Sequence, residues 1–494
     1  MRRNVRGAGA ALLDGNARLR YTLRRRRYLS PSLGLGGPVR ILQVVHQFLP
    51  NYAAGTEIYT YKLSKELLGR GHEVHVFHRD FGRPETEFLE EDAELDGLIL
   101  RRVVHNPPVP AGSFFLNPLI EKSFRSYVSR TSPDVIHFQH LDNLSPTLPA
   151  AAKELGKPTV MTLADFWLMC PARQLYDVEA ERVCEGAEEG RRCARCPTLV
   201  AVLPAAPSMP GIPRRLKRLV PVRVKDAVKR RLGRSGPPDG GTWAADYAGL
   251  IGAGLEARLR GMMALDLIIA PSGFIRNLHI EYGIPSEKIV RSDYGFDLAG
   301  LSGVHKSPSE VVRFGYAGTL HAHKGVHVLV EAFRAARLGN AVLKIFGWGD
   351  PAYLNSLKAE ARGPKIEFMG RYRPSDVAKV FSEMDVLVVP SLWYENSPLV
   401  IHEAFGTRTP TLVSDIGGMA ELVADGKGGM TFRAGSVEDL AAKLRLLAGD
   451  ESLRRSLADS APKVKTIEEN AEEMEEIYER LASRGAGDSE ARPL

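Results

Sequence analysis

Two glutamates eight residues apart, Glu395 and Glu403, are the strongest candidates for chemistry in this chain. They flank the start of a predicted helix that follows an apolar strand at residues 385–389. Ser397 suits the N-cap of that helix, and Pro398 suits its first position. The free N–H groups of a helix start attract anions such as a diphosphate, and carboxylates accept hydrogen bonds from hydroxyl groups. The pattern predicts a site for one extended ligand with both groups; the alternative is two acids that only cap the helix or face solvent.

Three further segments join a predicted strand to a predicted helix. Residues 318–325 (GTLHAHKG) contain Lys324, which could neutralise a phosphate through charge-assisted hydrogen bonds worth about 1.5–3 kcal/mol each. Residues 347–350 and 417–421 are glycine turns, in which the backbone can approach a ligand closely. A lysine or a glycine turn by itself is an ordinary surface feature, so these segments gain weight only from their order along the chain.

Apolar runs of strand length alternate with helical patterns along much of the 494-residue chain. Nearly continuous apolar runs are typical of parallel strands that helices cover on both faces. We therefore predict an α/β fold with two Rossmann-like, doubly wound parallel sheets, which face each other across a central cleft and bind ligands at the carboxyl ends of their strands. The predicted strands lie at residues 39–45, 73–77, 134–138, 159–163 and 266–270 in the first sheet, and at 312–316, 342–346, 366–369, 385–389 and 410–413 in the second.

Composition divides the chain into units. The predicted units are a basic disordered tail (1–38), a first domain (39–305) with a cysteine-rich and basic insertion (170–245), and a second domain with closing helices (306–494). Two Rossmann-like domains also occur in oxidoreductases that bind nicotinamide dinucleotides. The loop after the first predicted strand contains Ala53, Ala54 and Gly55 instead of the G-x-G-x-x-G fingerprint, and this disfavours a dinucleotide site.

Taken together and in this order, the segments resemble the nucleotide-sugar domain of glycosyltransferase family 4, a group of retaining GT-B enzymes. The first domain adds Gly55, the run from Asp165 to Trp167, and the run from Gly295 to Asp297. The resemblance covers roughly residues 39–470. It implies the GT-B fold, with a donor on the second domain and an acceptor on the first.

The resemblance also implies a role for each candidate residue. Glu395 would bind the hydroxyl groups of the donor sugar, Glu403 the ribose, and Lys324 the diphosphate. Gly55 would let the first loop approach the diphosphate from the other domain. The expected catalytic residues are Glu395, Lys324 and Asp165, and the expected donor-binding residues are Gly55, Thr319, Lys324, Arg371, Glu395, Asn396, Ser397, Pro398, Leu399 and Glu403. The resemblance implies no metal or other cofactor for catalysis.

Two positions depart from the family pattern. Thr319 stands where many relatives have an arginine, and we expect Arg371 to supply the missing diphosphate contact. Ala164 stands where relatives commonly have a histidine that contacts the donor sugar, and His137, His140 or Asp165 could compensate. These departures leave a rival open, namely a nucleotide-sugar-binding scaffold or regulatory protein that is weak or inactive as a catalyst.

Four cysteines, Cys170, Cys184, Cys193 and Cys196, have the spacing C-x13-C-x8-C-x2-C. Four thiolates can hold zinc tetrahedrally and stabilise a loop region, so the spacing predicts a structural zinc site. An iron–sulfur cluster and thiols without a ligand are the alternatives. A cytoplasmic location agrees with the clustering, because cysteines scattered in pairs are typical of oxidising compartments.

The net charge of +7 points to anionic partners. Residues 213–234 interleave ten basic residues with aliphatic ones, which favours peripheral contact with an anionic membrane at its inner face over a solvated loop. Nucleic acid is disfavoured because the segment lacks interleaved aromatics for base stacking. We predict a retaining glycosyltransferase that moves a sugar from a UDP- or GDP-sugar to a glycan or lipid-linked acceptor, in the synthesis of surface polysaccharide or glycolipid.

Overall fold

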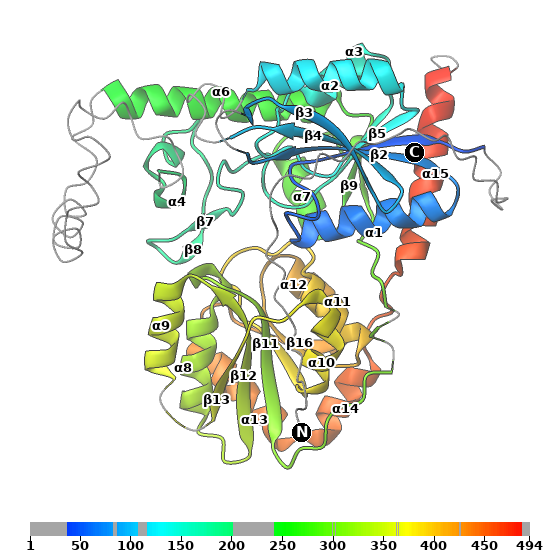
Figure 1. The fold of residues 1–494 in the computed structure, drawn as a ribbon. Coiled ribbons are helices and arrows are strands. Elements are labelled where there is room, and N and C mark those ends of the chain that lie inside the picture. The colour runs from blue at the N-terminus through cyan, green and yellow to red at the C-terminus, as the bar shows by residue number, and fades with distance from the viewer. Residues whose placement is uncertain are drawn as a thin grey trace, which may run out of the picture.

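The computed structural model describes residues 37–486 except for eight gaps, and it contains two α/β domains, one above the other in Figure 1. Residues 1–36 of the predicted tail and the basic segment 213–234 lie outside the described residues. The gaps within 37–486 are residues 83–85, 107–115, 201–241, 299, 302, 362, 364 and 424–425.

The first domain is built on an eight-stranded sheet in the order β10-β9-β6-β5-β1-β2-β4-β3. All neighbouring pairs are parallel except β3 with β4. The strands are β1 (Arg40–Val45), β2 (Glu73–Asp80), β3 (Glu90–Leu95), β4 (Leu98–Val104), β5 (Val135–Phe138), β6 (Thr159–Thr162), β9 (Leu267–Ala270) and β10 (Ile289–Arg291). The hairpin of β3 and β4 was not predicted, because the alternating acids of β3 carry no apolar strand pattern.

Helices cover both faces of this sheet, as its apolar strands require. Alternate residues of β1 show the two faces, since Leu42 and Val44 belong to one buried cluster and Ile41 and Val45 to another. The helices of the domain are α1 (Gly55–Gly69), α2 (Pro118–Thr131), α3 (Leu148–Glu154), α6 (Thr242–Ala264) and α7 (Gly273–Glu281). Helices α2, α3, α6 and α7 pack on the first cluster, and α1 packs on the second.

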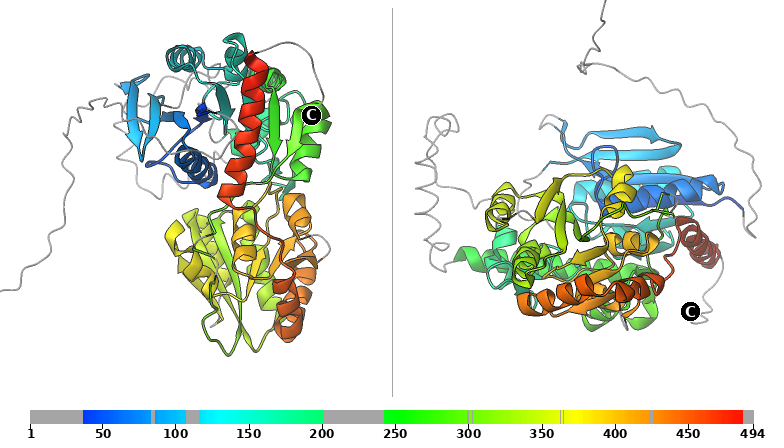
Figure 2. Two further views of the ribbon diagram at one scale, coloured as in Figure 1. Left: turned by 90° about the vertical axis from the view of Figure 1, so that its right-hand side faces the viewer. Right: turned by 90° about the horizontal axis from the view of Figure 1, so that it is seen from below.

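The last helix, α15 (Ile467–Ala486), corrects the predicted domain division. It was expected to close the second domain, but it packs beside α1 on the first. Figure 2 shows it lying along that domain. Its apolar side chains, including Met474 and Tyr478, complete the core there, and the Tyr59 hydroxyl donates to Asn470 Oδ1 at 2.9 Å. The helix therefore ties the two domains together.

The second domain has a six-stranded, wholly parallel sheet in the order β13-β12-β11-β14-β15-β16. The strands are β11 (Val312–Leu320), β12 (Ala341–Gly349), β13 (Ile366–Gly370), β14 (Val386–Val389), β15 (Thr411–Ser414) and β16 (Gly429–Phe432). Its helices are α8 (Val326–Ala336), α9 (Pro351–Glu360), α10 (Val377–Ser382), α11 (Leu399–Gly406), α12 (Gly417–Leu422), α13 (Val437–Gly449) and α14 (Glu451–Asp459). The predicted fold class, with two facing doubly wound sheets, is confirmed.

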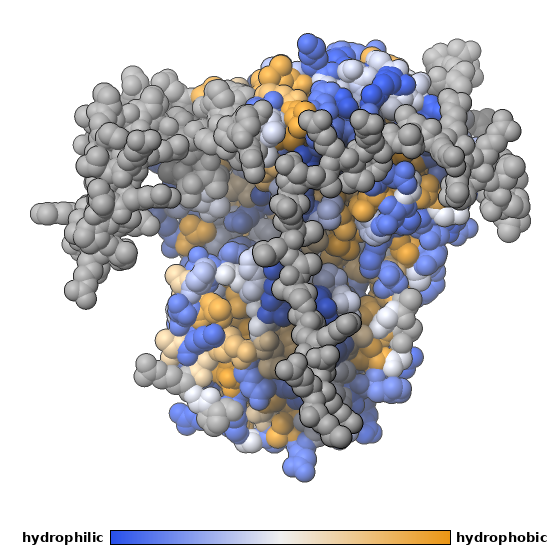
Figure 3. All heavy atoms as spheres, in the orientation of Figure 1, coloured by the Kyte–Doolittle hydropathy of each residue, from blue (hydrophilic) through white to orange (hydrophobic). Residues whose placement is uncertain are grey.

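The described part of the insertion is ordered. It contains a short hairpin of β7 (Tyr176–Asp177) and β8 (Arg182–Val183), the turn η3 (Cys193–Arg195) and α4 (Pro197–Val200). This region packs on α6 and reaches down toward α8 and α9 of the second domain (Figure 1). In Figure 3 hydrophilic and hydrophobic residues are mixed over the visible described surface. No helix among the described residues combines the length and apolarity needed to cross a bilayer.

Candidate active site

A cavity of about 440 Å³ lies between the two domains. Its walls come from segments at the carboxyl ends of the strands of both sheets, where parallel α/β sheets bind ligands. The first domain contributes Gly55, Thr56, Tyr59, Gln139, Thr162, Ala164, Asp165, Phe166 and Tyr294, and the second contributes residues from Tyr316 to Thr319, Lys324, Tyr372, Val389, Ser391, residues from Trp393 to Val400, and Glu403. The size falls within the roughly 300–1,000 Å³ usual for small-molecule sites.

Two helices from different domains begin at this cavity. Helix α1 starts at Gly55 and α11 starts at Leu399, and both residues line the walls. A Cβ atom on Gly55 would lie 3.3 Å from Leu399 Cδ1, so glycine allows the close approach of the two helix starts. The first N–H groups of a helix have no partner within it, so both helices offer donors and positive dipole ends to an anion.

Glu395 lies at the centre of a compact polar cluster. Its Oε1 atom accepts hydrogen bonds from Lys324 Nζ at 2.7 Å, Ser391 Oγ at 2.8 Å and Trp393 Nε1 at 2.9 Å. Burial by itself would raise the pKa of Glu395, but the charge and hydrogen bond of Lys324 and the two neutral donors lower it below its usual value. The carboxylate is thus ionised, and its Oε2 atom has no protein partner in the described part of the chain.

Glu403 lies in the first turn and a half of α11 and behaves differently from Glu395. It is partly buried on the wall of the cavity. Burial raises its pKa to about 7, although the charge of Lys62 acts in the opposite direction. Burial has removed water from this carboxyl group, so hydrogen bonds from the hydroxyl groups of a ligand would replace those that it has lost.

The raised pKa of Glu403 predicts a stability effect with a definite sign. A carboxyl whose pKa rises on folding makes the ligand-free fold less stable as the pH increases from 4.5 through about 7. We expect Glu403→Gln to unfold at a higher temperature than the wild type at about pH 8, by an amount worth at most about 3 kcal/mol, and to match it at about pH 3.5, below the ordinary pKa of the carboxyl. Thermal unfolding without ligand measures this. The exposed acid Glu472 supplies a control, since Glu472→Gln should behave like the wild type at both pH values.

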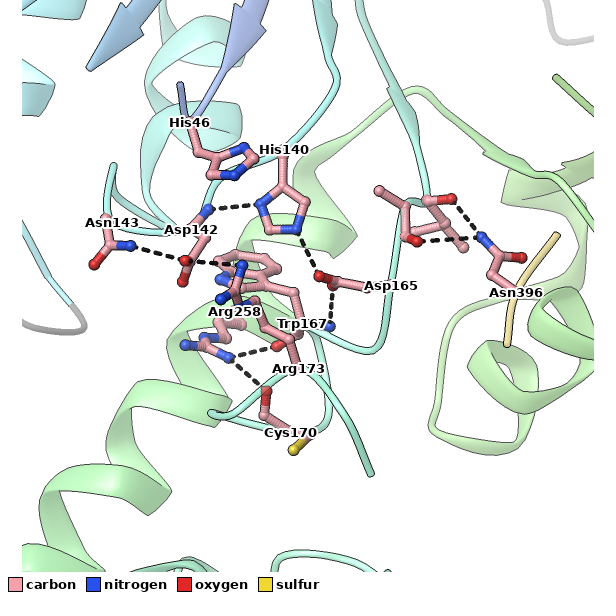
Figure 4. Close-up of polar contacts among 12 residues, drawn as sticks. His46, His140, Asp142, Asn143, Asp165, Trp167, Cys170, Arg173, Arg258 and Asn396 are labelled. Carbon is pink, nitrogen blue, oxygen red and sulfur yellow. Dashed lines mark hydrogen bonds and ion pairs between the residues drawn. The ribbon is translucent and has the colours of Figure 1, made fainter. Parts of the chain in front are cut away.

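Asp165 is fixed at the first-domain wall by His140 (Figure 4). The backbone N–H of Asp142 donates to His140 Nδ1 at 3.0 Å, so the proton of this imidazole is on Nε2, which lies 3.0 Å from Asp165 Oδ2. The backbone N–H of Trp167 donates to the other carboxylate oxygen at 2.8 Å. Burial opposes ionisation, but His140 and this N–H group lower the pKa of Asp165. Asp165 is therefore an oriented acceptor for a hydroxyl group in the cavity.

His137 does not compensate for the missing histidine at position 164. It is fully buried in the first sheet, where its Nδ1 atom lies 2.6 Å from the Tyr478 hydroxyl and its Nε2 atom lies 2.8 Å from Thr162 Oγ1. Burial lowers the pKa of His137 to about 3. Neither nitrogen is available to a ligand. Of the three suggested substitutes, only Asp165 lines the cavity.

Asn396 and Ser397 line the cavity, but their side chains bond across to the first domain. The Asn396 amide donates to the carbonyl of Leu163 at 3.0 Å (Figure 4), and the Ser397 hydroxyl donates to Asp293 Oδ1 at 2.8 Å. The sequence pattern placed Ser397 at the N-cap of α11, and this is corrected: the N-cap is Pro398, because the serine hydroxyl is used between the domains. Ligand contacts at these residues would come from the backbone.

Thr319 and Arg371 have different positions relative to the cavity. Thr319 is exposed on its wall, and the Tyr316 hydroxyl donates to the Thr319 carbonyl at 2.6 Å. Arg371 does not line the cavity. Its guanidinium lies 5.0 Å from the ring centre of Trp348, on the edge of the sheet beyond β13. The expectation that Arg371 replaces the missing arginine contact is therefore not supported, because the cation is held by an exposed ring outside the site.

The four cysteines are free thiols gathered in one region of the insertion. Burial and the three neighbouring cysteines raise the pKa of Cys193 to about 12. Within the described ranges, however, no three His, Cys, Asp or Glu side chains are arranged to hold a metal ion. The thiols as placed do not form a ligand set, and zinc stays a prediction, which elemental analysis of the purified protein tests as one equivalent per chain.

Sequence reasoning missed Ser391 and Trp393, the two neutral donors to Glu395. Both lie in the same segment as the glutamate. Their types were visible, but whether a side chain two or four residues away turns back to a carboxylate depends on the local loop conformation. A tryptophan two residues before a candidate acid, with its single N–H donor, is the signal that could have found this contact.

Comparisons with known proteins agree with this geometry. A family model described as Glycosyl transferases group 1 matches residues 312–450, and one described as Glycosyltransferase Family 4 matches residues 53–206. A D-inositol 3-phosphate glycosyltransferase of Corynebacterium urealyticum is 28% identical over 181 residues, which are 34% of this chain and 42% of that protein. The chain thus spans about two fifths of the length of the curated relatives that it matches.

Solved structures share the fold over nearly the whole chain. Sucrose-phosphate synthase from Thermosynechococcus elongatus has a TM-score of 0.61 at 17% identity, covering 90% of this chain and 99% of that one. Anabaena HepE in complex with UDP and glucose has a TM-score of 0.54 at 16% identity, covering 90% and 98%. Identities this low establish the fold alone.

Two facing parallel-sheet domains with a cavity at their carboxyl ends define the GT-B class of proteins. Within that class, the two family models together match the cavity-forming parts of both domains. The two models and the shared fold support a glycosyltransferase of the family 4, GT-B type.

Proposed function

We propose that this protein is a retaining glycosyltransferase that uses a nucleoside diphosphate sugar as donor. The observation that carries the proposal is the polar cluster at Glu395. It places an ionised carboxylate beside Lys324, in the cavity at which α1 and α11 begin. A donor bridging these features would present its diphosphate to the cation and helix starts, and its sugar hydroxyls to the carboxylate.

The chain's own groups would mainly stabilise the departing diphosphate. In the proposed step the bond between the anomeric carbon and the diphosphate oxygen breaks, and a new bond forms from the acceptor oxygen on the same face of the sugar. The acceptor proton passes to an oxygen of the leaving diphosphate. Lys324 and the N–H groups of the helix starts balance the charge that develops there, and Asp165 holds an acceptor hydroxyl from the opposite wall.

We propose a glycan or lipid-linked acceptor, in the synthesis of surface polysaccharide or glycolipid on the cytoplasmic side of the membrane. Support comes from the ten basic residues interleaved with aliphatic ones in the insertion, at residues 213–234, which suit an acceptor carried at an anionic membrane surface. The basic segment would add peripheral contact with anionic lipid.

A panel of sugar nucleotides tests the donor. A ligand at about 100 times its Kd stabilises a fold by about 2.7 kcal/mol, so UDP-glucose, GDP-mannose and their parent nucleotides are screened by thermal shift. Sugar release from the stabilising donor is then measured. The proposal is rejected if no member of a broad panel shifts unfolding or is hydrolysed, with Glu395→Ala indistinguishable from the wild type.

The rival, a donor-binding protein without turnover, rests on Ala164. This residue lines the cavity, and its side chain offers no hydrogen bond to a sugar. Ala164→His separates the two functions: a working transferase is expected to gain rate from a donor at this wall, whereas a binding protein should bind the donor and stay without turnover. Sugar release by wild type and Ala164→His, under donor saturation, is the measurement.

A further inference from the structure

The hairpin of β7 and β8 crosses from the first domain to the second. Tyr176, at the start of β7, is 3% exposed and belongs to the hydrophobic core of the second domain, together with residues such as Val326 of α8 and Leu392. Its sequence neighbours Cys170 and Leu175 belong to the core of the first domain instead. One aromatic side chain from the insertion is therefore buried in the core of the second domain, on the donor side.

A row of aromatic contacts runs from Tyr176 to the polar cluster. The Tyr176 ring centre lies 6.1 Å from that of His323, and the His323 ring lies 4.8 Å from Trp393, both in edge-to-face geometry. Trp393 Nε1 donates to Glu395, and Lys324 Nζ lies 4.8 Å above the indole ring. The ring centre of Phe166, from the first domain, lies 6.5 Å from that of Trp393 in edge-to-face geometry.

We propose that Tyr176 is a positioning residue for the donor sugar: by packing on His323 it holds Trp393 in the orientation in which its indole N–H fixes the carboxylate of Glu395. The cysteine-rich insertion of the first domain would then help to form the donor site on the second domain, through Tyr176. This role rests on the proposed function. It adds a residue of the first domain whose packing in the second domain would orient the carboxylate that binds the sugar. The physical reason is packing. A carboxylate keeps one orientation only if its hydrogen-bond donors are themselves held in place by the residues around them.

The ring of Tyr176 carries this role, and its hydroxyl group does not. The hydroxyl is buried and has no hydrogen-bond partner in the described part of the structure. Burial and the nearby charge of Lys324 lower the pKa of His323 to about 4, so the row is uncharged at neutral pH and acts through contact. Aromatic pairs in this geometry prefer fixed ring orientations, which is what a positioning role requires.

The test compares affinities for a sugar nucleotide and its parent nucleotide. Wild type, Tyr176→Ala and Tyr176→Leu are titrated with UDP-glucose and UDP, or GDP-mannose and GDP if the wild type prefers guanine. We expect both variants to lose about tenfold in affinity for the sugar nucleotide and little for the parent nucleotide, because the lost order is at the sugar-binding carboxylate. Tyr176→Leu keeps most of the apolar volume, so the measurement does not depend on the folding of the alanine variant.

Three controls sharpen the result. Tyr176→Phe keeps the ring and should retain wild-type affinities. Val178→Ala, at an exposed hairpin residue, should also leave them unchanged. In a Trp393→Phe background Tyr176→Leu should have no further effect, because residues that act through one contact are not additive. Equal losses for both ligands, or no loss for either, would overturn the positioning role. Failure of the wild type to bind any nucleotide would overturn the proposed function itself.

Discussion

Replacing Glu395 by glutamine is expected to reduce sugar transfer by about 100-fold, equivalent to about 2.7 kcal/mol of transition-state stabilisation. Glutamine keeps the shape of the side chain and an oxygen that can accept from Lys324, Ser391 and Trp393, so the fold should persist. The variant loses the ionised oxygen that would hold the sugar hydroxyls, and charge-assisted hydrogen bonds are roughly twice as strong as neutral ones. Initial rates with saturating acceptor measure the loss.

Binding of the parent nucleotide separates this effect from general damage. Removing a negative charge beside the proposed diphosphate position should leave UDP or GDP affinity unchanged or slightly higher. Glu367→Gln, at an exposed acid on β13 outside the cavity, is the matched control and should keep full activity. A Glu395→Gln protein with near wild-type transfer would remove the carboxylate from the mechanism.

Lys324→Ala is expected to impair both activity and stability. The ammonium is 2.7 Å from Glu395, and the two side chains are 22% and 11% exposed. Loss of the cation leaves a largely buried carboxylate without its partner, which should lower the free energy of unfolding by about 2–3 kcal/mol. Transfer should fall by at least about 100-fold, because no other described cation lines the cavity to balance the leaving diphosphate.

A double variant distinguishes the two roles of Lys324. Lys324→Met with Glu395→Gln replaces the charged pair by neutral groups of similar volume, so most of the lost stability should return. Transfer should remain as low as in the single variants. Chemical denaturation and initial rates are measured on the same preparations. If Lys324→Ala is as stable as the wild type, the pair contributes little to folding; if its transfer rate is also unchanged, the assignment of Lys324 to the diphosphate is wrong.

The sequence by itself determined the two-sheet fold and the principal site residues. All ten predicted strands appear in the structure within a few residues, because runs such as that of β14 are apolar throughout and buried on both faces. Glu395, Lys324 and Gly55 lie in the segments that follow β14, β11 and β1, so local pattern already placed them at the carboxyl edges that form the cavity.

Tertiary structure alone decided how the residues near these edges are used. Ser397 looked like a helix cap, but its hydroxyl bonds to Asp293, which is 104 positions away. The carbonyl of Leu163, which accepts from the Asn396 amide, is 233 positions away. Helix α15 has the same amphipathic pattern whichever domain it covers, so only the available apolar surface on the first domain could choose its place.

The same limit explains Arg371 and Tyr176. A guanidinium can reach a phosphate or stack on a ring, and the exposed ring of Trp348, near the carboxyl end of β12, lies close enough to hold the cation. Tyr176 sits in a cysteine-rich segment without a periodic pattern, and nothing local indicates that it enters the core of the other domain. The spacing of apolar residues along the chain predicts the helices, the strands and the strand ends. The partner of each side chain depends instead on contacts between segments that come together only when both domains have folded.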